Sequence, residues 1–241
     1  MAWLYLGELP DAVAIGDRVR LDGDEARHAV HVARARVGER LAIGDGAGRV
    51  ALGIVTGVAD AELRLEVEEL RIEPVPNPEL WLVQALAKGD RDELAIQAAT
   101  ELGASGIVPW AAERSVTRWE GPKAAKAHAR WAAIVREAAK QAIRSRVPVV
   151  APLARLGDLA RMPGAVLVLE PTASASISSV DLPTEGRIAL VVGPEGGVTP
   201  RELDALSAVG AVPVRLGPEV LRTSTAGPAA LTALNLRLGR W

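Results

Sequence analysis

The sequence contains no cysteine, and this absence excludes several kinds of chemistry. Without thiols the chain cannot form disulfides, use a cysteine nucleophile or hold zinc through cysteine ligands. A chain without cysteine also fits a reducing compartment. Histidine is scarce as well, and His28, His31 and His128 show no metal-ligand spacing with carboxylates. We therefore predict no metal site and interpret the three histidines as surface residues.

Long apolar runs are also missing. Arginine, aspartate, glutamate or proline interrupts every candidate before it reaches the roughly 18 residues that a membrane helix needs. The start of the chain has no basic region and too short an apolar stretch for a signal peptide. Hydrophobic residues make up 49% of the 241 residues, enough for one large domain or two modest ones. We predict a soluble, cytoplasmic protein with no membrane segment.

The net charge of −2 is distributed unevenly. Residues 110–150 carry nine basic side chains and three acidic ones, which makes this segment a candidate surface for phosphate groups. The alternative is the solvated face of a helix, which accounts for Lys123, Lys126 and Arg130. Arg114 and the segment from Arg144 to Arg146 flank that helix, so they are the better candidates for contacts.

A proline-rich segment, residues 73–78, indicates a stiff linker and a domain boundary after residue 73. Before it, short alternating runs separated by glycine and aspartate turns predict a small, mostly β module. Strands are expected around 19–21, 40–43, 50–55 and 63–67, with one helix from Glu25 to Arg36 after a cap signal at Asp22 to Asp24.

After the linker, strands alternate with helices, which favours a mostly parallel sheet covered by helices on both faces. The pattern predicts strands at 80–86, 106–109, 165–169, 188–192 and 212–216. Helices are expected at 90–102, from Pro122 through an apolar stripe that ends at Ile143, and at 202–209, with a final helix running through 231–238. Residues 172–179 are expected to form a surface loop.

The best clue to function is the glycine-rich loop from Gly193 to Gly197. It follows an apolar strand and precedes Thr199 to Glu202, which have the pattern of a helix capping box. In open α/β sheets, ligands bind at the carboxyl ends of the strands, and glycines there let the backbone approach a ligand closely. The alternative is an ordinary tight turn, for which Gly-Pro and Gly-Gly are sufficient.

Two further segments stand at strand ends, Leu169 to Pro171 and Leu216 to Thr225. Because the carboxyl ends of parallel strands share one edge, we expect all three segments to meet around one ligand. In the last segment, hydroxyl groups after Arg222 are expected to cap the final helix while Arg222 faces an anion.

Several enzyme classes lack their motifs. The loop has no Lys-Ser/Thr pair for a P-loop, and no Gly-x-Gly-x-x-Gly with a distant acid indicates a dinucleotide. No Gly-x-Ser-x-Gly element is present either. Methyl transfer from a sulfonium remains compatible with the residues present, because it needs alignment and deprotonation rather than a metal or a covalent nucleophile.

The two segments Gly193 to Glu202 and Leu216 to Ala226 resemble the signature segments of the RsmE family of bacterial 16S ribosomal RNA uridine N3-methyltransferases. The resemblance covers nearly the whole chain. Further matching stretches are Thr100 to Gly103, Glu113 to Ser115, Trp131, Lys140 to Pro148, His28, Val32, Arg34 and Gly38-Glu39.

The resemblance implies an α/β fold of the SPOUT type at residues 74–241, a trefoil-knotted parallel sheet that binds S-adenosylmethionine. A small PUA-like β-barrel domain for RNA would precede it at residues 1–73. The implied enzyme is a homodimer, and its substrate is N3 of a specific uridine in 16S RNA of the 30S ribosomal subunit. Alternatives are a non-catalytic ribosome-assembly or RNA-binding factor and a SPOUT methyltransferase acting on transfer RNA.

The resemblance also suggests roles for particular residues. Arg114 and Arg222 are candidates to stabilise the uracil anion, with phosphate positioning as the alternative. Glu195 is a candidate proton acceptor or cofactor contact. The predicted cofactor-binding residues are Leu169, Glu170, Gly193, Pro194, Glu195, Gly196, Gly197, Leu216, Gly217, Val220, Leu221, Thr223 and Thr225. The predicted RNA-binding residues are Arg27, His28, Arg34, Arg144 and Arg146.

The chain departs from the family pattern at three places. Glu219 and Ser224 stand where the family often has arginine and glutamate. Near the start, Trp3 and Tyr5 supply aromatic side chains without the usual arginine.

Overall fold

The computed structural model describes residues 4–241, so the aromatic side chain expected at Trp3 lies outside the described residues. The chain forms two compact units. One runs to Val75 and includes Ala139–Val147, and the other comprises Pro76–Ala138 and Pro148–Trp241. No helix among the described residues is both long and apolar enough to cross a membrane.

The first unit is built on a five-stranded sheet with the order β1-β3-β4-β5-β2. The strands are β1 (Leu4–Leu6), β2 (Arg18–Asp22), β3 (Arg40–Gly44), β4 (Arg49–Ala59) and β5 (Glu62–Ile72). Only the β1–β3 pair among these ladders is parallel. In β5, the buried Leu63, Leu65 and Val67 alternate with outward polar residues, as a sheet with one buried face requires. The mostly β module predicted from the alternating runs is therefore confirmed.

The helix of this unit is shorter than predicted. It consists of α1 (Gly23–Arg27) and one π-helical turn, η1 (His28–Val32), so its last four expected residues are not helical. The backbone turns at Arg34, whose φ of 57° is in the left-handed region, and Ala35 N–H donates to Ala29 O at 2.9 Å. A left-handed residue ends the helix there.

Ala139–Val147 belongs to the first unit because its side chains bond there. Lys140 Nζ lies 2.9 Å from Glu25 Oε1, and both side chains are largely buried. Arg146 donates to the carbonyl oxygens of Glu73 and Pro74. This segment follows the end of α3 (Pro122–Gln141). Ile143, expected on the apolar stripe of that helix, lies beyond its end with a φ of 54° and is 50% exposed, so that expectation is wrong.

The second unit contains a seven-stranded, entirely parallel sheet with the order β10-β12-β9-β11-β6-β7-β8. The strands are β6 (Glu79–Ala85), β7 (Gly106–Trp110), β8 (Val149–Val150), β9 (Ala165–Leu169), β10 (Ala175–Ser176), β11 (Arg187–Val192) and β12 (Val212–Arg215). The remaining helices are α2 (Arg91–Glu101), α4 (Leu156–Leu159), α5 (Pro200–Ser207) and α6 (Thr223–Arg237).

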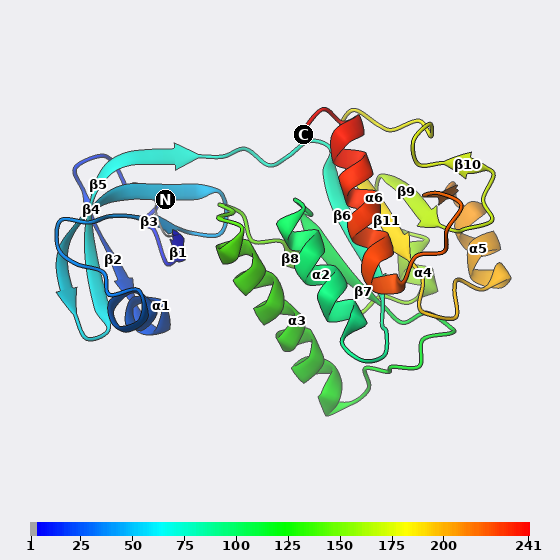
Figure 1. Cartoon of the computed structure of the whole chain (residues 1–241), viewed down its shortest axis with the longest axis horizontal. Coiled ribbons are helices and arrows are strands. Elements are labelled where there is room, and N and C mark those ends of the chain that lie inside the picture. The colour runs from blue at the N-terminus through cyan, green and yellow to red at the C-terminus, as the bar shows by residue number, and fades with distance from the viewer. Residues whose placement is uncertain (1–3) are drawn as a thin grey trace. The chain divides into compact units, whose positions relative to one another are not determined.

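Helices cover both faces of this sheet, as predicted. α2 and α6 contact each other and pack on β6, and Figure 1 shows these two helices side by side. On the opposite face, Leu159 of α4 and Leu206 of α5 join a core cluster with Val83 and Val191 of the central strands. The trefoil knot implied by the family resemblance stays a prediction.

The short elements β8, β10 and α4 of this unit were not expected from the sequence. α6 spans the segment expected to be helical as far as Arg237 and begins at Thr223, where the sequence places the capping hydroxyls; within it, Gly227 packs on Leu82, whose Cδ1 would lie 2.9 Å from an added Cβ. Close tertiary packing thus keeps the segment helical despite its weak helix formers. The expected loop at 172–179 contains the short strand β10, which pairs with β12.

Candidate functional site

A cavity of about 370 Å³ opens where β9, β11 and β12 end and α6 begins. Its volume falls within the range of about 300–1,000 Å³ typical of small-molecule sites. The three strand-end segments singled out from the sequence meet here. The cavity is lined by Arg91, Leu169, Glu170, Pro171, Val192, Gly193, Pro194, Glu195, Gly197, Val198, Val214, Arg215, Leu216, Gly217, Glu219, Val220, Leu221, Arg222, Thr223 and Ala226.

Two of the predicted cofactor-binding residues lie outside this lining. Gly196 faces Arg114, whose Cβ would lie 3.1 Å from an added Cβ. Thr225 lies in the first turn of α6, where its N–H bonds to Arg222 O at 2.8 Å, and its side chain is exposed. The other predicted cofactor residues, and Arg222, line the cavity.

Sequence reasoning missed several lining residues. β11 ends at Val192, and β12 ends at Val214 and Arg215. These residues could have been predicted from the rule that ligands bind at the carboxyl ends of parallel strands. Arg91 was missed although it follows the carboxyl end of β6, a strand of the same sheet. Val198 and Ala226 were missed too, whereas Pro171 and Glu219 lie in segments that were expected to meet around the ligand.

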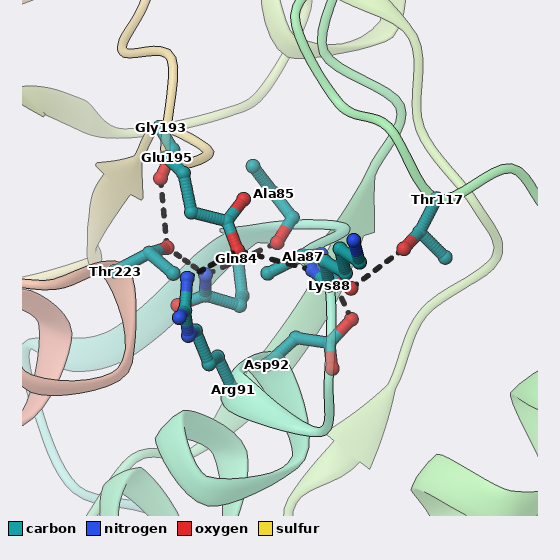
Figure 2. A network of polar contacts seen from close by, with 10 residues as sticks. All are labelled: Gln84, Ala85, Ala87, Lys88, Arg91, Asp92, Thr117, Gly193, Glu195 and Thr223. Atoms are coloured by element: carbon teal, nitrogen blue, oxygen red, sulfur yellow. Dashed lines mark hydrogen bonds and ion pairs between the residues drawn. The ribbon is translucent and has the colours of Figure 1, made fainter.

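A hydrogen-bonded chain ties α6 to the loop after β11 (Figure 2). The fully buried Gln84 donates from Nε2 to Thr223 Oγ1 at 2.9 Å, and Thr223 Oγ1 donates to Gly193 O at 2.8 Å. The Thr223 hydroxyl therefore binds the backbone of the loop after β11. The expectation that a hydroxyl caps α6 is wrong, because Arg222 is the N-cap residue and makes no side-chain cap bond.

The Glu195 carboxylate binds the turn between β6 and α2. Its Oε1 accepts from Lys88 N and from Arg91 Nη1, each at 3.1 Å (Figure 2). Burial raises the pKa of Glu195, but hydrogen bonds from its own N–H, from Lys88 and from Arg91 outweigh burial and hold the pKa below its usual range. The lowered pKa makes the Glu195 carboxylate a weaker base, which weakens its candidacy as the proton acceptor at neutral pH.

The same turn is also held from its other side. Asp92 Oδ2 accepts from Ala87 N at 3.0 Å, while Thr117 Oγ1 donates to Ala87 O at 2.7 Å (Figure 2). Burial raises the pKa of the Asp92 carboxyl, and backbone hydrogen bonds act in the opposite direction. The turn is therefore fixed at Ala87 as well as at Lys88.

The capping box predicted at Thr199 to Glu202 is confirmed. Glu202 N donates to Thr199 Oγ1 at 3.2 Å, and Thr199 N donates to Glu202 Oε2 at 2.9 Å. The other carboxylate oxygen, Glu202 Oε1, accepts from Glu113 N at 2.8 Å. Glu202 is 1% exposed, so this buried acid joins the start of α5 to the chain after β7.

Arg114 follows Glu113 and reaches the glycine-rich loop. Its Nη1 donates to Gly196 O at 2.8 Å. Arg114 does not line the cavity, in contrast to Arg222. Both arginines were candidates to stabilise the uracil anion, but they have different positions. Arg114 binds the backbone of the glycine-rich loop, and Arg222 lies in the cavity wall.

The five predicted RNA-binding residues lie in the first unit, outside the cavity. Arg34 is exposed, and Arg27 pairs with Asp24. Arg146 is engaged with two backbone carbonyl oxygens, and burial lowers the pKa of Arg144 to about 10 while Glu73 opposes this shift. His28 is half-buried against Tyr5, with ring centroids 6.1 Å apart, so the expectation of a surface histidine is wrong there.

His31 is exposed, as expected, and its Nε2 lies 2.9 Å from Asp60 Oδ1. His128 is half-buried, and its Nε2 lies 3.1 Å from Ala151 O, so it too differs from expectation. No group of three or more potential metal ligands occurs within residues 4–241.

Known proteins resemble the chain along almost its whole length. Residues 74–235 match a model described as an RNA methyltransferase domain, and residues 21–68 match an RNA methyltransferase PUA domain. Ribosomal RNA small subunit methyltransferase E of Mycobacterium bovis is 43% identical, over 98% of this chain and 92% of that protein. The protein of the same name from Bacillus subtilis is 33% identical over 89% and 88% of the two chains.

The fold has a solved counterpart. The crystal structure of a ribosomal RNA small subunit methyltransferase E from Neisseria gonorrhoeae, bound to S-adenosyl methionine, matches with a TM-score of 0.86. The two sequences are 29% identical, and the match covers 98% of each chain.

Proposed function

The chain belongs to the RsmE family, the ribosomal RNA small subunit methyltransferases E, and we propose that it transfers a methyl group from S-adenosylmethionine to N3 of a specific uridine in 16S ribosomal RNA. The observation that carries this proposal is the cavity at the ends of β9, β11 and β12. Both segments that resemble the family signatures line it, and they come from different parts of the chain.

The residues of the cavity fit S-adenosylmethionine. Glycines at 193, 197 and 217 keep side chains out of part of the wall, and the carboxylates of Glu170 and Glu219 offset a cationic ligand. We expect the backbone of 193–197 and 216–221 to hold the adenine and methionine parts, with Leu169 and Glu170 closing the opposite side. The bound cofactor supplies a methyl group on a positively charged sulfonium.

The chain's own task is to orient uracil and to favour loss of its N3 proton. A guanidinium near the uracil carbonyl oxygens would stabilise the anion that forms, and the position of Arg222 in the cavity wall supports this role. Arg114 supports the reaction indirectly, because its bond to Gly196 O holds the loop that faces the cofactor. In this proposal Arg222 is catalytic and Arg114 is a positioning residue.

The first unit is proposed to bind the RNA through Arg27, His28 and Arg34, together with Arg144 and Arg146. Arg146 would act indirectly, since its donors already hold Glu73 and Pro74. We propose that residues 1–73 and 74–241 are the functional domains, that two copies form a homodimer, and that the enzyme works on the 30S subunit in the cytoplasm.

A parallel methylation assay tests the proposal. Full-length protein and labelled S-adenosylmethionine are incubated with deproteinised 16S RNA, assembled 30S subunits and transfer RNA, and the modified nucleotide is mapped. The expected product is N3-methyluridine in 16S RNA. Label in transfer RNA would instead support the alternative SPOUT substrate. Cofactor binding without methylation of any of the three RNAs would support a non-catalytic factor.

A further inference from the structure

We propose that Arg91 is a further catalytic residue, whose guanidinium contacts the target uracil and stabilises its N3 anion together with Arg222. This inference rests on the proposed function and names a residue that the sequence motifs did not indicate. Arg91 lines the same cavity as the strand-end segments, and 44% of its side chain is exposed.

The position of Arg91 in its helix calls for an anionic partner. Arg91 is the first residue of α2, where the helix dipole already places partial positive charge, and Asp92 and Glu93 are the favourable acids of that turn. A cation at this position costs helix stability unless a negative group offsets it. Glu195 does so with one hydrogen bond, from Arg91 Nη1. A guanidinium has five N–H donors, so it can hold Glu195 and a second acceptor at once.

The turn that carries Arg91 is built to hold it in place. Gly89 and Asp90 both have left-handed backbone, with φ of 67° and 60°, and the latter conformation is strained for a residue other than glycine. The bond from Lys88 N to Glu195 fixes this turn to the loop after β11, and the bonds of Ala87 to Asp92 and Thr117 fix it to α2 and to the segment after β7 (Figure 2). A prearranged cation stabilises developing charge without having to reorganise during the reaction.

A comparison of the cations in the cavity wall leads to the same residue. Among the described residues, the cationic side chains lining it are Arg91, Arg215 and Arg222. Arg215 Nη1 donates to the carbonyl oxygens of Ala173 and Ser174, at 2.6 and 2.7 Å. Arg215 is thus tied to the backbone before β10, and we assign the contacts with the uracil carbonyl oxygens to Arg91 and Arg222, the other two cations of the wall.

The reaction balances without another reagent. The N3 proton passes to water, the N3 electron pair forms the bond to the methyl carbon, and the bond from that carbon to sulfur breaks to leave a neutral thioether. The arginines exchange no proton in this scheme. They lower the pKa of the uracil N3–H by placing positive charge beside its anion.

Single-turnover methylation of 30S subunits by R91Q tests the inference, with R161Q as the matched control. Arg161 is also an exposed arginine in an ion pair, with Asp158 at 3.1 Å, and it lies outside the cavity. A cation close to an ionising group shifts a pKa by about 1–3 units. We therefore expect R91Q to lower the rate constant at pH 7 at least ~10-fold. The R161Q rate should equal that of the wild type.

The pH profile separates catalysis from a structural role. The wild-type rate should rise with pH as N3 ionises, and the R91Q profile should be displaced to higher pH, so the defect shrinks in alkaline solution. R91K should lie between the two proteins because lysine keeps the charge but loses the planar fork. Calorimetric affinity for S-adenosylmethionine and filter binding of 30S subunits should both stay within ~3-fold of wild type.

Three outcomes overturn the inference. Weaker subunit binding with an unchanged pH profile would make Arg91 a phosphate contact. A loss of S-adenosylmethionine affinity would assign it to the cofactor. A wild-type rate for R91Q would remove it from the site while the proposed function stands, whereas absent methylation by the wild-type protein would contradict the proposed function itself.

Discussion

Single side chains that are far apart in the sequence assemble the cavity wall. Gln84 and Thr223 are separated by 139 positions, yet their hydrogen bond and the next one to Gly193 O join α6 to the loop after β11. Because these groups are buried, each depends on its partner: an unpaired polar group in the interior costs about 1–3 kcal/mol. Substitution of one of these buried groups should therefore lower the free energy of unfolding measurably.

Thr223→Val removes the central hydroxyl at nearly constant volume. It leaves Gly193 O without this donor and Gln84 Nε2 with only the carbonyl oxygen of Ala85, so we expect a loss of about 1–3 kcal/mol in the free energy of unfolding. Urea denaturation measures the effect. Thr225→Val is the control and should change stability by less than about 0.5 kcal/mol, because Thr225 is exposed. Equal losses in the two variants would contradict the assigned role of Thr223.

Arg222→Ala tests the proposed catalytic cation. At saturating S-adenosylmethionine we expect the maximal rate to fall by about 10²-fold, the scale of losing one preorganised charge-stabilising group. Single-turnover methylation of 30S subunits gives the rate, and calorimetry checks that the cofactor still binds. An unchanged maximal rate would exclude Arg222 from the chemistry and leave it as a binding residue.

At the scale of elements, the start of α5 joins the end of the glycine-rich loop to the segment after β7. Thr199 and Glu202 cap the helix, and the same glutamate binds Glu113 N, next to the arginine that contacts Gly196 O. One helix terminus thus positions both the loop that precedes it and the segment after β7.

Thr199→Ala should cost about 1–2 kcal/mol of stability, because it removes the N-cap hydroxyl and leaves Glu202 N without its acceptor. Chemical denaturation gives the value. Ser207→Ala at the exposed end of the same helix is the matched control, with an expected change below about 0.5 kcal/mol. If the two substitutions cost the same, the cap does not stabilise α5.

At the scale of the whole molecule, the charge on Glu195 makes stability depend on pH. Its pKa is lowered in the folded protein, so the unfolded chain binds the proton more readily in acid. The contribution of Glu195 is therefore present above its unfolded pKa and is lost as the pH falls through its lower folded pKa.

Comparison of wild type with Glu195→Gln from pH 7 down to pH 3 tests this linkage. The wild type should be the more stable at pH 7, and the difference in urea midpoint should decrease in acid as Glu195 becomes protonated. Glu185→Gln, at an exposed position of the same unit, is the control for losing one negative charge. A difference that stays constant across this range would contradict the lowered pKa.

Local patterns in the sequence determined most of the elements of this protein. Alternation and short apolar runs indicated the strands, the Thr199 to Glu202 pattern indicated the capping box, and the strand-end rule brought three segments together. These features depend on neighbours a few residues apart, so they can be read from the chain alone.

Only the tertiary structure decided which charged side chains meet and which of them line the cavity. Arg91 and Glu195 meet across 104 positions, Gly227 of α6 packs on Leu82, and Arg114 binds Gly196 O without lining the cavity. Each of these outcomes depends on packing between residues that are distant in sequence. Local propensity carries no information about such distances, so the fold itself determines which cations line the cavity.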